Sequence, residues 1–236
     1  MATYACSDLH GCYSLYEQMI KDLKPEDVVY FLGDAGDRGP ESYKTICAIL
    51  DNPQFIYLKG NHEDMLIECM EAYLKEDYSK RYAFDLLKGN GGSQTFEDWV
   101  ADPNKEQRYE QLKKLEYIVS YINLKGQNVI LTHAGFTPKI NAKTPSEQYL
   151  LWDRNHMDDE WDEAHFYDVY IVHGHTPIQA ILSMNTQQDI SKYAGGHKID
   201  IDNASFLTGK AVLFDLDWFE FRSYYDEKIA LHRSRS

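Results

Sequence analysis

Residues 33–40, Gly-Asp-Ala-Gly-Asp-Arg-Gly-Pro, restrict the fold of this chain more than any other stretch. They follow an apolar run, residues 28–32, that is typical of a buried strand. The glycines and the proline cannot continue that strand, so two carboxylates and a guanidinium meet in a tight loop at its carboxyl end. In open α/β sheets ligands bind at that end. Carboxylates suit a divalent cation and arginine suits a phosphate, although the same residues also occur in ordinary turns with a surface ion pair.

The same order of strand, polar loop and helix is predicted on both sides of this stretch. Residues 3–6 form a strand-like run that leads to Asp8 and His10, and a third strand leads to Asn61 and His62. Asp8 and His10 are two apart, so their side chains point to the same side of an extended chain and can chelate one metal. Asn61 offers an amide oxygen as a ligand, whereas His62 points elsewhere and is available for proton transfer. Three such units in a row predict an α/β fold.

Residues 65–117 differ in character from the rest of the chain. Helical stretches are predicted at residues 65–74, 82–87 and 107–115, which are rich in aromatic residues and are interrupted by the glycine-rich residues 89–92. Just before them, Glu63 and Asp64 are interpreted as capping residues at a helix N-terminus. We expect a helical excursion within a single domain of residues 1–236. It either covers the sheets or contacts the substrate, and the sequence favours neither alternative.

Further strands are predicted in the second half of the chain, at residues 117–124, 128–131, 169–172, 197–201 and 211–216. The last two are expected to form a hairpin across the loop that contains Gly209. The second of the five leads to His133. The third ends in His173-Gly174-His175, of which only one histidine need be a ligand.

Three charged or titratable residues lie outside this pattern of strand ends. Arg154 follows an apolar cluster and by itself would be an ordinary surface charge. His156 and His165 follow no strand, and we predict that both are exposed and have no role in the site.

Composition excludes several classes of function. The chain has 236 residues and is 43% hydrophobic, which is enough for a full core in one domain. Its formal net charge of −14 argues against a broad nucleic-acid-binding face. No apolar run approaches the roughly 18 residues of a membrane-spanning helix. The four cysteines lack paired spacing, which favours reduced thiols. We therefore expect a cytoplasmic protein without nucleic-acid or membrane partners, and the sequence leaves the oligomeric state open.

Taken together, the predicted loops offer nitrogen and oxygen ligands but no cysteine. The residues concerned are Asp8, His10, Asp34, Asn61, His133 and one of His173 or His175. Such a set suits manganese, iron, zinc or cobalt better than a soft metal. Asp34, central in this set, could bridge two ions. Two metals about 3.5–4 Å apart clamp the attacking and leaving oxygens of a displacement, which fits hydrolysis of a phosphate ester.

Five motifs in this order resemble those of a known enzyme family. They are Asp-x-His-Gly, Gly-Asp-x-x-Asp-Arg-Gly, Gly-Asn-His-Glu, His-Ala-Gly and Gly-His-Thr, and they extend from Asp8 to Pro177. They are similar to the phosphoprotein phosphatase branch of the calcineurin-like metallophosphoesterases. Bacterial and phage serine/threonine phosphatases and symmetrical diadenosine tetraphosphatases have the most similar patterns. The fold that this resemblance implies is α/β, with two mixed β-sheets packed as a sandwich flanked by helices, in four layers.

The resemblance also implies a role for each matching residue. Asp8 and His10 would hold one metal, Asp34 would bridge, and Asn61, His133 and His175 would hold the second. It selects His175 rather than His173, because the family ligand is the histidine of Gly-His-Thr. Arg38, Arg154 and Asn61 would bind the phosphate, and His62, oriented by Asp37, would protonate the leaving alkoxide. The implied cofactors are two divalent ions, manganese first, with iron, zinc, cobalt or nickel as alternatives.

The expected function is hydrolysis of phosphomonoesters by direct attack of metal-bound hydroxide. The first substrate hypothesis is phosphoserine or phosphothreonine in proteins, and the partner is then a phosphorylated protein or a small phosphoester. The alternative is a symmetrical dinucleoside polyphosphate hydrolase acting on diadenosine tetraphosphate. A second alternative is a non-catalytic binding protein that keeps the fold.

Overall fold

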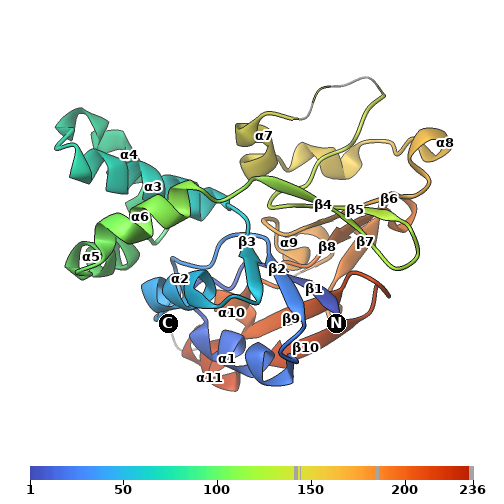
Figure 1. The fold of residues 1–236 in the computed structure, drawn as a ribbon, viewed down its shortest axis with the longest axis horizontal. Coiled ribbons are helices and arrows are strands. Elements are labelled where there is room, and N and C mark those ends of the chain that lie inside the picture. The colour runs from blue at the N-terminus through green and yellow to red at the C-terminus, as the bar shows by residue number, and fades with distance from the viewer. Residues whose placement is uncertain (141–142, 144, 184–185, 234–236) are drawn as a thin grey trace.

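A computed structural model describes residues 1–140, 143, 145–183 and 186–233 of the chain (Figure 1). It contains two five-stranded sheets that pack face to face with helices outside them, which confirms the predicted α/β sandwich of mixed sheets. Apolar side chains from both sheets fill the space between them, among them Leu32, Leu131 and Phe214. No helix in the described ranges is both long and apolar enough to cross a bilayer.

The first sheet contains the three strands predicted around residues 33–40. Its order is β10-β9-β1-β2-β3. The strands β1 (Thr3–Cys6), β2 (Val28–Phe31) and β3 (Phe55–Tyr57) are parallel to one another. β9 (Lys210–Asp215) runs antiparallel to β1, and β10 (Phe221–Tyr225) runs antiparallel to β9 and therefore in the same direction as β1. The intervening helices are α1 (Tyr13–Asp22) and α2 (Ser42–Asp51). Because β1, β2 and β3 are parallel neighbours, their carboxyl ends lie at one edge of the sheet.

The second sheet brings the other predicted loops to the same region. Its order is β4-β5-β6-β8-β7. The strands are β4 (Ile118–Ile122), β5 (Asn128–Thr132), β6 (Val169–His173), β7 (Ser191–Tyr193) and β8 (Lys198–Asp200), of which β5, β6 and β8 are parallel. Short helices cover it: α7 (Glu147–Trp152), η2 (Asn155–Asp158), α8 (Glu163–Phe166), α9 (Ile178–Ile181) and η3 (Ala194–Gly196).

The predicted hairpin across Gly209 is wrong. β8 pairs with β6 and β7 in the second sheet, whereas β9 pairs with β1 and β10 in the first. The segment between them contains the short helix α10 (Ser205–Thr208), which begins after Ala204 and ends at Gly209, both with left-handed backbone. These turns carry the chain from one sheet to the other. Alternating hydrophobicity identifies a strand but not the strand that it pairs with.

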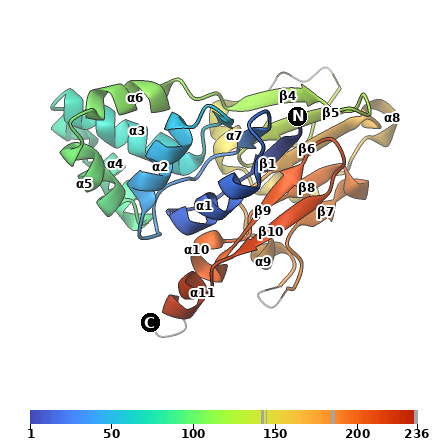
Figure 2. The ribbon, with the colours of Figure 1, turned by 60° about the horizontal axis from the view of Figure 1, so that its bottom comes forward.

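The predicted helical excursion is present and extends to one side of the sheets (Figure 1). It consists of α3 (Asn61–Leu74), η1 (Tyr78–Lys80), α4 (Arg81–Gly89), α5 (Ser93–Ala101) and α6 (Lys105–Lys113). α3 begins earlier than predicted, at Asn61, and α5 is an additional helix. The fully buried Trp99 packs against Tyr73 and Phe96, and it belongs to the same buried cluster as the apolar residues of β1, β2, α1 and α2. A last helix, α11 (Glu227–Arg233), follows β10 and packs against α10 (Figure 2).

Candidate metal centre

The predicted ligands meet where the carboxyl ends of strands from both sheets face each other. They follow β1, β2 and β3 of the first sheet and β5 and β6 of the second. All are buried: Asp8, His10, Asp34, Asn61, His133 and His175. Strands separated by more than a hundred residues therefore contribute to one cluster.

Backbone conformation marks the same residues. Ten non-glycine residues in the described ranges have a positive φ, and six of these are predicted site residues: Asp8, His10, Asp34, Asp37, Arg38 and His175, with φ from 43° to 68°. For residues other than glycine this left-handed region is uncommon and costs about 1–3 kcal/mol each. Such strain persists only where the surrounding structure enforces it, and it gathers at functional sites.

A close approach of two loops places Asn61 and His62 beside Asp34. A Cβ atom added to Gly33, which has φ +98°, would lie 2.5 Å from the backbone of Gly60. Glycine is therefore required at position 33 both by its conformation and by the absence of space. This contact sets the loop after β2 directly against the start of α3.

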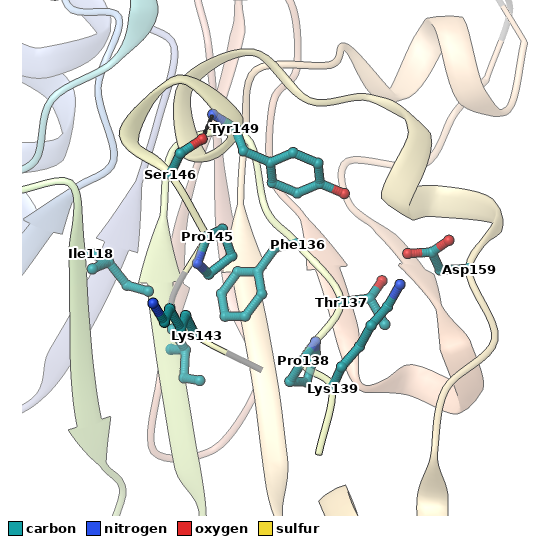
Figure 3. A pocket seen from close by; sticks show the side chains of 11 residues that line it. Ile118, Phe136, Thr137, Pro138, Lys139, Lys143, Pro145, Ser146, Tyr149 and Asp159 are labelled. Atoms are coloured by element: carbon teal, nitrogen blue, oxygen red, sulfur yellow. Dashed lines mark hydrogen bonds between the residues drawn. The ribbon is translucent and has the colours of Figure 1, made fainter. Parts of the chain in front are cut away.

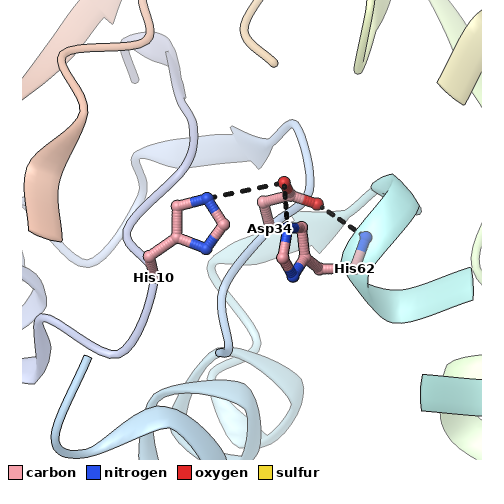
Figure 4. Close-up of side chains that lie close together, drawn as sticks. All are labelled: His10, Asp34 and His62. Atoms are coloured by element: carbon pink, nitrogen blue, oxygen red, sulfur yellow. Dashed lines mark hydrogen bonds and ion pairs between the residues drawn. The ribbon is translucent and has the colours of Figure 1, made fainter. Parts of the chain in front are cut away.

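Asp34 lies at the centre of the cluster (Figure 4). Its Oδ2 is 3.6 Å from Nε2 of His10 and 3.8 Å from Nε2 of His62, and its Oδ1 is 3.5 Å from Nε2 of His133. Two groups of potential ligand atoms, each within 4.8 Å of one another, share this carboxylate. One is His10, Asp34 and His62, and the other is Asp34, His133 and His175. A carboxylate common to two groups is the arrangement expected of a bridging ligand.

The second group presents lone pairs that face one another. His133 donates its Nδ1 hydrogen to the carbonyl of Leu32 at 2.8 Å, so its Nε2 carries a lone pair. That nitrogen lies 2.8 Å from Oδ1 of Asn61, which is also 3.0 Å from Nδ1 of His175. Nε2 of His175 is buried and has no hydrogen-bond partner among the described residues. Nε2 of His133 and Oδ1 of Asn61 are both acceptors, so their close approach is stabilised when a cation lies between them.

Asp8 belongs to neither of these two groups. Its Oδ2 accepts hydrogen bonds from the backbone N–H of His175, at 3.1 Å, and from the hydroxyl of Ser7. Its Oδ1 is buried and, within the described ranges, has no partner. A buried carboxylate oxygen without a hydrogen-bond partner is suited to bind a metal ion, so Oδ1 of Asp8 can be a further ligand.

The electrostatics of the cluster favour a bound cation. Burial, reinforced by Asp8 and Glu63, raises the pKa of Asp34 well above its usual range, and burial together with Asp202 does the same for Asp8. Burial lowers the pKa of His10, and that of His133 to about 3. The carboxylates therefore lack compensating charge and the histidines stay neutral, as ligands must be. The six residues fit a pair of divalent ions, and no cysteine is present to select a soft metal.

The predicted catalytic and phosphate-binding residues lie around the cluster. His62 donates from Nδ1 to Oδ2 of Asp37 at 2.6 Å. The two terminal nitrogens of Arg38 each lie 2.8 Å from a histidine Nε2, one from His10 and the other from His62. Arg154 donates to the hydroxyl of Thr176 at 2.9 Å, and it lowers the pKa of His175 after the larger effects of burial and His133.

The two histidines of the His-Gly-His sequence point to different surroundings. His175 joins Asn61 and His133, whereas Nε2 of His173 is 2.5 Å from the hydroxyl of Tyr193. The prediction that His156 is exposed is wrong, because it is fully buried beside His173. His165 is exposed, as predicted. The sequence showed no apolar strand before His156, and its burial depends on packing between loops of the second sheet.

Glu63 has a larger role than capping a helix. It completes a capping box at the start of α3, as predicted. Its carboxylate also accepts the backbone N–H groups of Asp34 at 2.7 Å and Ala35 at 2.9 Å, and the hydroxyl of Tyr57 at 2.7 Å. Glu63 therefore holds the loop that presents Asp34. Its position in Gly-Asn-His-Glu was the only sequence signal for this role.

A pocket of about 520 Å³ elsewhere in the molecule contains none of these residues. Its described lining includes Phe136, Lys139 and Tyr149, and it lies over β4 and β5 of the second sheet (Figure 3). The convergence of ligand atoms, rather than the presence of a cavity, identifies the candidate site.

Comparison with known proteins agrees with this geometry. Residues 1–212 match the family of calcineurin-like phosphoesterases. The chain is 28% identical to serine/threonine-protein phosphatase 2 of Escherichia coli over 198 residues, covering 78% of this chain and 84% of that protein. It is 25% identical to an asymmetrical bis(5'-nucleosyl)-tetraphosphatase, PrpE, of a Geobacillus species, covering 73% and 77% of the two chains. A metallophosphoesterase from Sphaerobacter thermophilus has the same fold, with a TM-score of 0.58 and 15% identity, covering 100% of this chain and 93% of that one.

Proposed function

This chain belongs to the calcineurin-like phosphoesterase family, and on that premise we propose that it hydrolyses phosphomonoesters, with phosphoserine and phosphothreonine of proteins as its first substrates. The observation that carries the proposal is that two groups of ligand atoms share the carboxylate of Asp34. The relative named serine/threonine-protein phosphatase 2, of which the chain covers 84%, supports the choice of substrate.

In this proposal each ligand has one position in the metal centre. Asp8 and His10 would hold one ion, Asn61, His133 and His175 would hold the other, and Asp34 would serve as a ligand to both. Two divalent cations supply Lewis-acid charge and lower the pKa of bound water to about 7. Manganese is the first choice, with iron, zinc, cobalt or nickel as alternatives, because oxygen and imidazole ligands accept each of them.

The arginines bind the phosphate group. The side chain of Arg38 lies between His10 and His62 at the mouth of the centre and is exposed to solvent on its other side. A guanidinium presents two parallel donors to phosphate oxygens, so Arg38 and Arg154 together orient the ester and balance the charge that develops on it. Asn61 assists from inside the centre.

His62 protonates the leaving group. Asp37 accepts the Nδ1 hydrogen at 2.6 Å, which fixes the ring orientation and stabilises the imidazolium. In the structure Nε2 accepts a hydrogen bond from Arg38 at 2.8 Å. When Arg38 turns its donors to the phosphate, Nε2 can take up a proton and transfer it to the departing alkoxide oxygen. An alkoxide of serine or threonine is a poor leaving group, so this proton matters most for such esters.

A dinucleoside polyphosphate hydrolase is the second candidate. A relative of comparable coverage is named an asymmetrical bis(5'-nucleosyl)-tetraphosphatase, and another relative, of which the chain covers 50%, is named a symmetrical one. A binding protein without activity is disfavoured, because a fold alone does not require six strained or buried ligands to converge. We also propose a cytoplasmic location, since all four cysteines are described and none forms a disulfide.

The deciding experiment combines metal analysis with parallel assays. Purified protein, stripped of metal and reloaded with manganese, is tested on p-nitrophenyl phosphate, a phosphoserine peptide and diadenosine tetraphosphate. We expect two ions per chain and a higher kcat/KM for the phosphopeptide than for the dinucleotide. A higher kcat/KM for the dinucleotide would select the second candidate, with ADP as the product of symmetrical cleavage. Loaded protein that hydrolyses none of the three would contradict the proposed function.

A further inference from the structure

A groove of about 620 Å³ opens beside the candidate metal centre, on the side of His10. We call it the Phe206 groove, and the lining residues that matter here are Tyr13, Arg38, Gln94, Phe206, Lys228 and Ile229. They come from α1, the loop after β2, α5, α10 and α11. The helices α1, α10 and α11 that bound it are visible together in Figure 2. Its volume lies within the range of roughly 300–1,000 Å³ that is usual for small-molecule sites.

The groove is continuous with the reacting region. Arg38 lines it and also contacts His10 and His62. The ring of Phe206 lies 5.3 Å from the ring of His10, between centroids, and 5.0 Å from the guanidinium carbon of Arg38. A phosphate held by Arg38 therefore has its organic substituent at the entrance to this groove.

The chemistry of the groove suits a flat, partly polar ring. The ring of Phe206 and the side chain of Ile229 supply apolar surface on which a flat ring can pack. Gln94 is exposed on α5 and carries an amide that can both donate to and accept from the edge of a base. These features together correspond to a nucleobase.

Charge favours the same occupant. Of the two carboxylates of the groove, Glu41 pairs with Lys44 at 2.7 Å, whereas Asp226 accepts a hydrogen bond from the neutral hydroxyl of Ser14 at 2.5 Å and keeps its negative charge. Arg38 and Lys228 also line the groove, so its cations outnumber the one carboxylate that no lysine pairs with. A second groove, of about 410 Å³, lies near Trp152 and is lined by Asp64, Glu68 and Glu147, which would repel phosphate. A nucleotide is therefore directed to the Phe206 side.

We propose that the Phe206 groove binds the nucleoside part of a leaving group, so that among small-molecule phosphomonoesters this enzyme prefers nucleotides to esters without a base. The inference rests on the proposed phosphoesterase activity and adds a class of small-molecule substrate to it. For adenosine 5'-monophosphate, a bond forms between phosphorus and the oxygen of water, and the bond from phosphorus to O5' breaks. The proton from His62 goes to O5', the proton that the attacking water loses passes to solvent, and the products are adenosine and inorganic phosphate.

The test compares adenosine 5'-monophosphate with ribose 5-phosphate, which has the same primary alkoxide leaving group but no base. For the manganese-loaded wild type we expect kcat/KM to be about tenfold higher for the nucleotide, since stacking of a base on an aromatic side chain contributes at that level. Phe206→Leu should lower this ratio to about threefold or less, and Gln94→Ala should lower it partly. Phe221→Leu, a matched change at an exposed phenylalanine of β10, should leave the ratio unchanged.

Two outcomes separate this inference from the activity on which it rests. The ratio of kcat/KM for the nucleotide to kcat/KM for ribose 5-phosphate is decisive. If it is near one in the wild type, or if neither Phe206→Leu nor Gln94→Ala alters it, the proposed nucleoside binding is wrong while the phosphoesterase activity is still supported. If no ester is hydrolysed at all, saturation-transfer NMR of adenosine 5'-monophosphate with the metal-free protein decides. If saturation is transferred to the adenine protons by the wild type but not by Phe206→Leu, nucleoside binding in the Phe206 groove is supported. If the wild type transfers no saturation, the proposal is wrong.

Discussion

Two pairs of buried histidines lie close together near the end of β6, and they differ in what surrounds them. The rings of His133 and His175 are 4.9 Å apart and those of His156 and His173 are 5.1 Å apart. Burial lowers the pKa of His133 and His173 to about 3, and that of His156 to about 4. Burial alone therefore does not distinguish the two pairs.

Their partners distinguish them. The first pair converges on the amide oxygen of Asn61, and Asp34 lies 3.5 Å from His133. In the second, His173 bonds to the hydroxyl of Tyr193, and the fully buried ammonium of Lys198 donates to the backbone oxygen of His156. A positive charge there repels a cation. Convergent carboxylate and amide oxygens, rather than buried imidazoles, therefore mark a metal centre.

The strongest test of this difference is Asp34→Asn set against His173→Gln. Asp34→Asn should reduce kcat on p-nitrophenyl phosphate by about 10⁴-fold, because a bridging ligand contributes several kcal/mol to the transition state and each 1.36 kcal/mol is tenfold. Metal content should fall with it. His173→Gln should keep two ions and most of the activity. Comparable metal loss in both variants would erase the distinction between the two pairs.

The melting temperature of Asp34→Asn provides a second test that does not depend on activity. Metal-free Asp34→Asn should melt at a higher temperature than the metal-free wild type at pH 7. The reason is that it removes a buried carboxylate whose pKa is raised by burial and by neighbouring carboxylates. A lower melting temperature would mean that Asp34 is primarily structural.

His62 tests whether a carboxylate partner gives a histidine a chemical role. Its Nδ1 is held by Asp37, whereas His173 is held by a tyrosine hydroxyl. His62→Ala should slow hydrolysis of a phosphoserine peptide by about 10²–10³-fold, the usual contribution of general acid catalysis. The loss on p-nitrophenyl phosphate should be much smaller, since that leaving group needs no proton. Equal losses on both substrates would remove His62 from the role of proton donor.

His156 should affect stability and leave chemistry unchanged. Its folded pKa of about 4 lies below the usual 6.5, so between these values the unfolded chain binds a proton that the folded chain does not. Stability is then fully present above pH 6.5 and is lost as the pH falls toward 4. The loss approaches about 3 kcal/mol, at 1.36 kcal/mol per pH unit. His156→Leu should remove this slope from denaturant unfolding measured at several pH values, and an unchanged slope would contradict the assignment.

The smallest effect is expected at a left-handed residue outside the site. Glu76 is exposed, has φ 51° and follows the C-terminal end of α3, a position where glycine is preferred. Glu76→Gly should raise the free energy of unfolding by about 1 kcal/mol without changing activity. The equivalent change His10→Gly also relaxes the backbone but should abolish activity. Destabilisation by Glu76→Gly would show that this turn is not strained.

Local sequence patterns predicted the parts of this molecule that depend on neighbours in the chain. The apolar runs before Asp8, Asp34 and Asn61 indicate strands, and parallel order then requires their ends to meet. Hence the α/β class and the convergence of these three loops were accessible from residues alone, whereas the sandwich of two mixed sheets was implied by the resemblance to a known family. The selection of His175 over His173 needed the resemblance of Gly-His-Thr to a family motif.

Features that depend on contacts distant in sequence were missed. Whether the strand after Gly209 returns to β8 or crosses to the other sheet depends on α10, a helix too short to show a period. The burial of His156 depends on Lys198, 42 residues away. Phe206 lies far from His10 in the chain, so nothing in the sequence connects them.

The distribution of the ligands over both sheets has a consequence for how the protein matures. During synthesis a growing chain has Asp8, His10, Asp34 and Asn61 long before His175 leaves the ribosome. The first half can offer only part of a coordination sphere, and it must wait for β5 and β6 to be made and docked. Loading with metal is therefore a late step, and a chain interrupted before Gly174 should remain without its full complement of ions.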